Sequence, residues 1–235
     1  MATTDERVAS QFDTAIGNAY GALQTVQQAI VGAGPEAHAA MKALSDRAVM
    51  LQGVGSTARD YITKLRADES LPLDYRQNMS AQIHHAADGR LRDERDALVR
   101  DMLPKLESAL AEGTLPQPGK DAGDRQLRRQ ELDRLLAGVT GELLAGKMAD
   151  LIGKNPAWDS ELLSDHGRAV LEAAGVGREW PNLRRIAAGK LMNSTVGTEK
   201  QLANRKALTA FYQTKLAGHV DGLYRIAKSK LGDTP

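Results

Sequence analysis

The sequence predicts an all-α protein, in which an antiparallel bundle of three long helices is followed by a second helical half of about four helices. Two observations lead to this fold class. Apolar residues recur with a seven-residue repeat through much of the first 112 residues, a pattern typical of coiled coils and long bundle helices. No stretch of useful length alternates between apolar and polar residues, as a half-buried strand would.

The first helix is expected to follow a capping box at Thr3-Thr4-Asp5-Glu6, where a hydroxyl and a carboxylate accept hydrogen bonds from unpaired backbone amides. Its apolar positions step alternately by four and three residues, and the repeat stops at Gly32-Ala33-Gly34-Pro35. These positions are Val8, Phe12, Ile16, Ala19, Leu23, Val26 and Ile30.

A second helix should begin near Pro35, because proline suits the first turn of a helix. Its apolar repeat keeps its phase through Gly53 and Gly55. We therefore expect one long helix, with either a soft point or a close approach of another backbone at the glycines. The repeat comprises Ala37, Met41, Leu44, Ala48, Leu51, Gly55, Ala58, Ile62 and Leu65.

The third helix is predicted from about Asp74 to Glu112, with a kink where Pro104 removes a backbone hydrogen bond near Arg100. Its middle, residues 88–96, has one large apolar residue in nine. That segment is therefore expected either to be solvated or to pack against a polar neighbour.

Residues 113–123 are predicted to be a linker, because they contain three glycines and two prolines in eleven residues. This linker separates a net acidic half, residues 1–112, from a net basic half, residues 124–235. The first half carries 12 Lys+Arg against 16 Asp+Glu, and residues 181–235 carry 10 against 3. The late basic excess suits either an anionic partner or the acidic half of the same molecule.

In the second half, Asp124 is expected to cap a helix with an apolar face that includes Leu132 and Leu136. The apolar face moves after Gly138, Gly141 and Gly146, so this helix either breaks or is buried on two sides. Two shorter helices are expected at about 159–174 and 181–192. A second capping box at Thr198-Glu199-Lys200-Gln201 should open a final helix that reaches Leu231.

Three arginines directly after the linker, Arg125, Arg128 and Arg129, share the side of their helix that carries Leu132 and Leu136. They lie near the helix N-terminus, where the dipole disfavours cations, so they need an anionic partner. Pairing with Glu107 and Glu112 is the favoured interpretation. The alternative is a docking patch for an acidic surface or a phosphate.

The segment Leu171–Gly177 resembles the turn of a helix-turn-helix, a motif that often carries Ala-Gly-Val-Ser at this point. The resemblance implies that Arg178, Arg184, Arg185 and Lys190 face DNA. It covers about twenty residues and departs in two places, since Leu171 stands where a small residue is usual and Pro181 falls in or near the recognition helix. An ordinary connection between two helices is therefore favoured.

The final helix is basic, but its cations spread around the helix instead of forming the single stripe that would follow a phosphate backbone. Lys200, Arg225 and Lys228 are among them. Phe211 projects away from the apolar face, so it either packs on a second neighbour or is exposed for a partner. All of these residues are candidates for partner binding.

The sequence supplies no recognisable catalytic, cofactor or metal motif. His84, His85 and Asp88 are the nearest to a metal cluster, but two ligands one turn apart do not form a site. Glycine–lysine pairs are never followed by Ser or Thr, so there is no phosphate-binding loop. Cysteine is absent and aromatic content is 4%, which argues against thiol chemistry and large base-stacking surfaces.

We therefore expect a non-enzymatic structural or adaptor protein that acts as a subunit of a larger assembly, such as a bacterial or phage particle, through protein partners or self-association. The N-terminus lacks the pattern of a signal peptide and no apolar run is long enough to span a bilayer, which favours the cytoplasm or a particle assembled there. A nucleic-acid-binding regulator that uses Gly175 and the basic C-terminal segment is the alternative. A weaker alternative is an enzyme or small-ligand protein with a pocket between the halves, which a deep polar cleft lined by His84, His85 or His166 would support.

Overall fold

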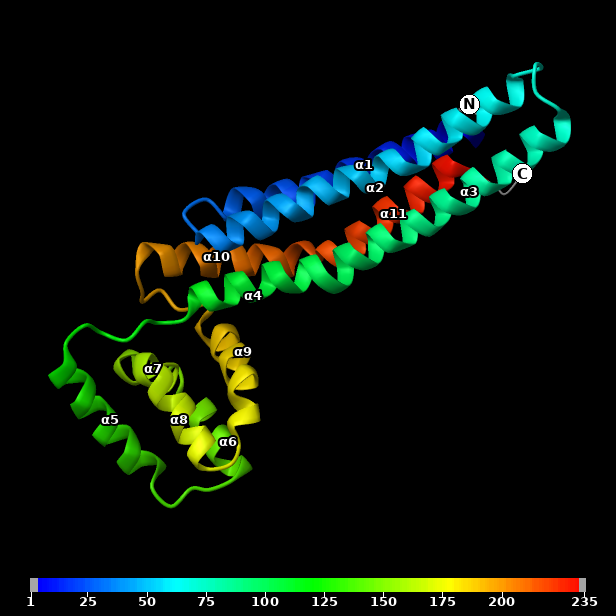
Figure 1. The fold of residues 1–235 in the computed structure, drawn as a ribbon. Coiled ribbons are helices and arrows are strands. Elements are labelled where there is room, and N and C mark those ends of the chain that lie inside the picture. The colour runs from blue at the N-terminus through cyan, green and yellow to red at the C-terminus, as the bar shows by residue number, and fades with distance from the viewer. Residues whose placement is uncertain (1–3, 233–235) are drawn as a thin grey trace. The chain divides into compact units, whose positions relative to one another are not determined.

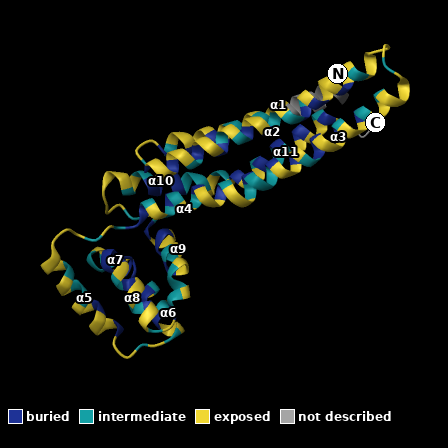
Figure 2. Cartoon of the chain, viewed as in Figure 1, coloured by how far each residue is buried: buried dark blue, intermediate teal, exposed yellow. Residues whose placement is uncertain are grey.

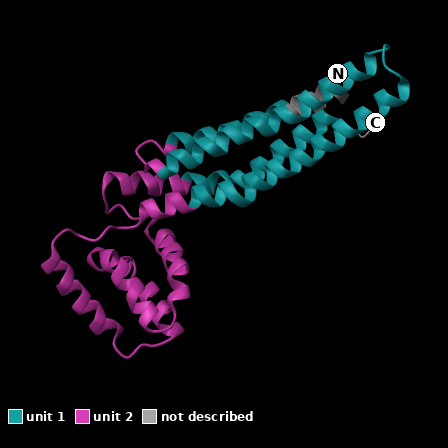
Figure 3. Cartoon of the chain, viewed as in Figure 1, with its two compact units in different colours: residues 1–28, 36–107, 210–235 teal, residues 29–35, 108–209 magenta. Residues whose placement is uncertain are grey.

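The computed structural model describes residues 4–232, with side chains from residue 13 onward, and these residues are helical with no strand among them (Figure 1). This confirms the predicted fold class. The chain divides into two compact units (Figure 3). Unit 1 combines residues 1–28, 36–107 and 210–235, and unit 2 combines residues 29–35 and 108–209.

Unit 1 is built mainly from four helical segments. They are α1 (Thr4–Ala29), α2 (Pro35–Ala67), α3 (Leu73–Asp96) with its continuation, and α11 (Leu216–Leu231). Along each of them, buried and exposed positions recur with helical spacing (Figure 2). Every predicted apolar position of α2 from Ala37 to Ile62 is buried, and so are the four α1 positions from Ala19 to Ile30. The predicted capping box at Thr3–Glu6 and the side chains of Val8 and Phe12 lie outside the described residues.

The predicted order, three long helices and then a separate half, is not confirmed, because α11 belongs to unit 1. It packs antiparallel to α3: His84 Nε2 lies 3.0 Å from the Gly232 carbonyl oxygen, and Arg95 Nε donates to Asp221 Oδ1 at 2.7 Å. One face of α11 is buried by this packing, with Leu216, Val220, Leu223, Ile226, Ala227 and Leu231 on it. Burial of this apolar face, and not its position in the chain, decides where the last helix lies.

Helix α2 is continuous through both glycines, as predicted, and Gly55 marks a close crossing with α11. A Cβ atom at Gly55 would collide with the carbonyl oxygen of Ala227, whereas one at Gly53 would meet nothing within 4 Å. The two glycines therefore differ in role. Gly55 lets two backbones approach, and Gly53 lies on the exposed side of the helix.

Between α3 and α4 (Leu103–Thr114) the backbone forms a π-helical stretch, η1 (Ala97–Met102). The Leu103 amide donates to the Leu98 carbonyl, five residues back. This stretch directly precedes Pro104, which has no amide to donate and would clash with the carbonyl four residues earlier. The predicted disturbance near Arg100 therefore takes the form of a wider helical turn.

The polar middle of α3 packs against polar neighbours, which is one of the two expected outcomes. Asp88 and Glu94 are buried. The Asp88 carboxylate lies 3.1 Å from Lys228 Nζ of α11 and also pairs with Arg92, while Glu94 pairs with Arg47 of α2. Burial tends to raise the pKa of Asp88, but the bonds from Lys228 and Arg92 hold it below its usual value.

Unit 2 contains shorter helices than predicted from apolar periodicity. They are α5 (Ala122–Leu136), α6 (Glu142–Leu151), α7 (Pro156–Leu162), α8 (Asp165–Ala173), the 3₁₀ turn η2 (Gly177–Glu179), α9 (Trp180–Leu191) and most of α10 (Glu199–Thr214). The helix after the linker breaks between α5 and α6, where Gly138 and Gly141 have φ angles of 78° and 59°. The predicted helix 159–174 is wrong, because Ser164 interrupts it and caps α8.

Helix ends in unit 2 follow side-chain caps. The predicted box at Thr198–Gln201 is confirmed, with the Thr198 amide donating to Gln201 Oε1 at 2.8 Å and the Gln201 amide to Thr198 Oγ1 at 3.3 Å. The cap of α5 is Asp121, not Asp124 as predicted. The prediction of a single final helix was also wrong, because Lys215 adopts a left-handed conformation with φ 49° and separates α10 from α11.

The predicted linker belongs to unit 2, and its first residues pack against other parts of that unit. Helix α4 continues through Gly113 to Thr114, and Leu115 is only 3% exposed. The Leu115 carbonyl accepts a 2.9 Å hydrogen bond from Gln201 Nε2. Gly113 is required here because a Cβ atom would collide with the buried Asn204 side chain.

Candidate functional site

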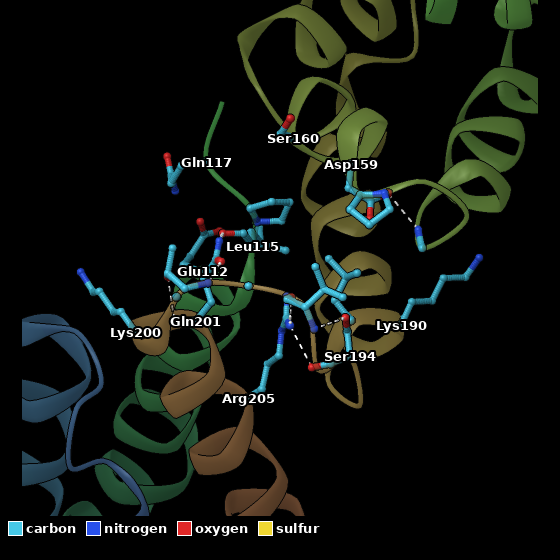
Figure 4. A pocket seen from close by; sticks show the side chains of 18 of the residues that line it. Glu112, Leu115, Gln117, Asp159, Ser160, Lys190, Ser194, Lys200, Gln201 and Arg205 are labelled. Atoms are coloured by element: carbon cyan, nitrogen blue, oxygen red, sulfur yellow. Dashed lines mark hydrogen bonds between the residues drawn. The ribbon is translucent and has the colours of Figure 1, made fainter. Parts of the chain in front are cut away.

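Unit 2 contains a cavity of about 660 Å³, which we call the unit 2 cavity. Its walls are formed by the segments 112–119 and 193–201 together with residues of α5, α7, α9 and α10. Figure 4 shows Asp159 and Ser160 entering from α7, Lys190 from α9 and Arg205 from α10. The charged lining residues are Glu112, Arg128, Asp159, Lys190, Lys200 and Arg205.

Arg205 is the most unusual of these residues, because its guanidinium is buried and forms no ion pair with a carboxylate of the described residues. The residue is 4% exposed. Nη1 donates to the carbonyl oxygens of Ser194 and Val196 at 2.9 and 2.5 Å, and Nη2 donates to that of Thr114 at 3.3 Å. Nε is buried with no hydrogen-bond partner in the described part of the chain. Burial lowers the pKa of Arg205, which is the mark of a desolvated charge.

Asp159 is the acidic counterpart on the cavity wall, and it is 2% exposed. Its Oδ1 accepts a 2.9 Å hydrogen bond from the Gly153 amide. Burial raises the pKa of Asp159, and the Gly153 bond and the charges of Arg205 and Lys190 offset this only in part. Asp159 and Arg205 interact through their charges, but no ion pair between them forms in the described structure.

The remaining charges leave an excess of positive charge around the cavity. Glu112 pairs with Arg184, whose guanidinium also lies 5.4 Å from the centroid of the Trp180 ring. Lys190 Nζ donates to the Ala149 carbonyl at 2.6 Å, and a carbonyl does not neutralise its charge. Arg128 has a distant ion pair, 3.8 Å long, with an exposed aspartate one turn before it in α5.

The chemistry of the lining favours binding of an anion. The lining includes no histidine and no aromatic side chain. Ser160 Oγ donates to the Ala157 carbonyl at 3.2 Å, so its hydroxyl is not oriented by a general base as an activated nucleophile would be. Among residues 13–232, no group of three or more potential metal ligands lies close together.

Three of the predicted partner-binding residues, Arg128, Lys190 and Lys200, meet at this cavity. Arg125 and Arg129 do not, because their Nε atoms donate to Glu161 Oε1 and Oε2 at 2.8 and 2.7 Å. Pairing inside the molecule was the favoured interpretation, but the predicted partners were wrong. Glu161 is fully buried in α7, and Glu107 instead accepts a hydrogen bond from a tyrosine.

The other predicted residues lie away from the cavity. Arg185 is exposed on α9, with Nη2 donating to Asn182 Oδ1 at 3.2 Å. In unit 1, Lys228 pairs with Asp88 as described above, and Arg225 is exposed on α11. Phe211 is half-buried and meets the neighbouring Tyr212 ring edge-on at 5.6 Å.

The segment that resembles a helix-turn-helix forms α8, a turn and α9. Gly175 has a φ of 74°, so it supplies the left-handed residue that such a turn needs. On α9, Arg184 and Lys190 are engaged with Glu112 and a backbone carbonyl, as described above. The turn therefore agrees with either interpretation, while all four cations expected to face DNA have partners within unit 2, Arg178 with Glu142 and Arg185 with Asn182 among them.

Sequence reasoning missed Arg205 and Asp159, the two buried charges of the cavity. Arg205 stands one turn before the buried Leu208 and one turn after Gln201, so its place on the inner face of α10 was a usable signal. Asp159 offered none, because it begins a run of buried residues from 159 to 164 in which apolar and polar side chains are mixed.

Unit 1 carries a second surface feature, an apolar groove of about 450 Å³ between α2 and α3, which we call the α2–α3 groove. Small side chains form much of its floor, and Met50 and Arg90 are at its edges. Met50 is 56% exposed. The groove is lined by Met50, Gly53, Val54, Thr57, Ala58, Ile83, Ala86, Ala87 and Arg90.

Comparisons with known proteins add no identification to this geometry. No helix in the described chain is long and apolar enough to cross a membrane. No protein-family model matches the sequence, and no curated protein or solved structure shows significant similarity to it.

Proposed function

We propose that the protein is a non-enzymatic structural or adaptor protein that acts as a subunit of a larger protein assembly. The observation that carries this proposal is the α2–α3 groove. Long helices normally cover an apolar strip of this kind with a neighbouring element, and a groove bordered by exposed apolar side chains suits an amphipathic helix of a partner. A bacterial or phage particle assembled in the cytoplasm is the setting we favour.

The shape of the groove supports a helical partner. Gly53, Ala58, Ala86 and Ala87 lie along it, and small side chains let a second helix approach closely. Exposed Met50 provides a flexible apolar contact. Arg90 adds a cation at the edge, so an acidic residue beside the apolar face of the partner helix would be complementary.

Light scattering on the intact chain tests this proposal, because a monomer has a mass of 25.3 kDa. We expect a larger species, either alone or together with a protein captured from the host lysate. Met50→Glu should weaken the association, because the new carboxylate would have to lose water where the partner helix makes apolar contact. Leu143→Glu is the matched control, since Leu143 is 77% exposed on α6 of unit 2.

Association that Met50→Glu does not weaken would show that the groove is not the interface. A strict monomer that captures no protein would overturn the proposed function. Tight binding of duplex DNA by that monomer, with affinity falling steeply between low and moderate salt, would favour the nucleic-acid-binding alternative.

A further inference from the structure

The unit 2 cavity contains more positive charge than its own residues neutralise, and this is independent of the α2–α3 groove. Arg205 is buried among three carbonyl oxygens, and no ion pair with a carboxylate forms within the described residues. Carbonyl dipoles solvate a guanidinium but do not cancel its charge. A negatively charged ligand in the cavity would, so the desolvated guanidinium of Arg205 favours binding of an anion there.

The other groups on the wall increase this imbalance. Arg128, Lys190 and Lys200 add three cations. Of the two acidic lining residues, Glu112 is paired with Arg184, and the hydrogen bond that Asp159 accepts within the described chain comes from the Gly153 amide. Arg128 has a long ion pair with Asp124. The other three cations, Arg205, Lys190 and Lys200, therefore outnumber Asp159, the lining carboxylate that forms no ion pair among the described residues.

The size and lining of the cavity narrow the class of ligand. A volume of about 660 Å³ is within the range of small-molecule sites and much larger than one inorganic ion needs. Leu115, Leu191 and Val196 provide apolar contacts beside the cations. Because the lining has no aromatic side chain, it offers no surface on which a nucleobase would stack.

We propose that the unit 2 cavity binds a small, multiply charged oxyanion, with a polycarboxylate and a phosphate ester without an aromatic ring as the two sources of that chemistry. Lys200 and Arg128, which line the cavity and are exposed or half-buried, bind the anion directly, and Arg205 supplies the buried positive potential. This site goes beyond the proposed role in assembly and does not depend on it.

Arg205 is a poor residue for the test, because it also ties Ser194, Val196 and Thr114 together and its loss would disturb folding. Lys200 is better suited, since it is exposed and its side chain forms no hydrogen bond or ion pair within the described residues. Lys200→Ala and Arg128→Ala therefore probe the cavity. Lys147→Ala is the matched control, because Lys147 is an exposed lysine on α6 that does not line the cavity.

The experiment is isothermal titration calorimetry on the full chain with citrate and with pyrophosphate, at an ionic strength fixed with potassium chloride. We expect saturable binding of at least one probe, with a dissociation constant of about 1 mM or tighter. Lys200→Ala and Arg128→Ala should each weaken binding by about fivefold to tenfold, while Lys147→Ala leaves it unchanged.

The two probes separate the two sources. Binding of citrate alone assigns a carboxylate ligand, and binding of pyrophosphate alone assigns a phosphate ligand. The proposal is overturned if neither probe saturates, or if Lys147→Ala weakens binding as much as Lys200→Ala, because the attraction would then come from the charge of the whole surface.

Discussion

Removing the negative charge of Glu161 should loosen α5 from α7. Glu161 is fully buried and accepts bonds from Arg125 and Arg129, the two residues that the sequence offered as a docking patch. Removal of one member of a buried ion pair typically costs about 3–5 kcal/mol. Both arginine side chains remain about one third exposed and can regain water, so we expect about 3 kcal/mol for Glu161→Ala.

Glu161→Gln retains the volume and one carbonyl oxygen, so its cost should be smaller, about 2 kcal/mol. The control is Glu142→Gln. Glu142 pairs with Arg178 at 3.1 Å, but both side chains are more than 70% exposed, and exposed pairs contribute about 0–1 kcal/mol. Urea denaturation gives the free energy of unfolding, and hydrogen exchange reports whether the α5 amides open first.

The pH dependence of this variant provides a second test. Burial alone would raise the pKa of Glu161, but the bonds and charges of Arg125 and Arg129 hold it below its ordinary value. Folding therefore favours the ionised form. Its stabilising contribution is complete above the ordinary glutamate pKa of about 4.3 and is lost as the pH falls through the lower folded-state value. The difference between the wild type and Glu161→Gln should narrow in that acid range.

Equal losses for Glu161→Gln and Glu142→Gln would refute this reasoning. Unchanged exchange of the α5 amides in Glu161→Gln would refute it independently. Either result would mean that apolar contacts, and not the buried ion pairs, hold α5 in place.

Two further predictions use neighbouring or isosteric substitutions. Gly55→Ala should destabilise unit 1 by about 2 kcal/mol or more, because the new Cβ meets the carbonyl oxygen of Ala227. Gly53 has open space around it, so Gly53→Ala should stabilise α2 by about 0.5–1 kcal/mol. Thermal unfolding of the two variants distinguishes these opposite effects. Asp159→Asn should raise stability at pH 7, because burial raises the pKa of Asp159 and the charged form is the one that folding disfavours. This gain should disappear below the ordinary aspartate pKa of about 3.9, and a gain that persists there would contradict the assignment.

The first part of the fold could be predicted because its helices obey one rule. Helix α2 buries a single apolar stripe, so its repeat identifies eight buried positions from Ala37 to Ile62. The same rule does not say what covers the stripe. The covering of α3 by α11 depends on contacts such as Arg95 with Asp221, which are 126 residues apart, and no local pattern encodes them.

The main errors of the sequence prediction were missed helix breaks that no glycine or proline marks. Ser164 separates α7 from α8 by accepting an amide hydrogen bond as a cap, yet serine is also common inside helices. Lys215 adopts a left-handed conformation that a lysine reaches only when surrounding contacts compensate its cost. Nothing in the sequence beside Lys215 signals this break.

Only the exposed and half-exposed cations of the candidate site could be predicted from the sequence. Arg128, Lys190 and Lys200 are exposed or half-exposed cations, and composition reveals an excess of such residues. The role of Arg205 depends instead on its burial among carbonyl oxygens, with no ion pair to a carboxylate of the described residues. That environment arises only when α4, α7, α9 and α10 are placed together, so it belongs to packing and not to any segment.

The excess of basic over acidic residues in 181–235 is larger than the positive charge that a partner could contact, because several of these cations are paired within the protein. Arg184 is neutralised by Glu112, and Lys228 lies beside Asp88. Arg205 donates only to carbonyl oxygens, which satisfy its hydrogen bonds but leave its charge. An ion pair neutralises the charge of a cation. A cation that is buried among carbonyl oxygens keeps its charge, and because the surroundings are less polar than water, its electrostatic attraction for an anion is stronger. We therefore expect an anion to be attracted more strongly to the unit 2 cavity than to the exposed cations of the final helices.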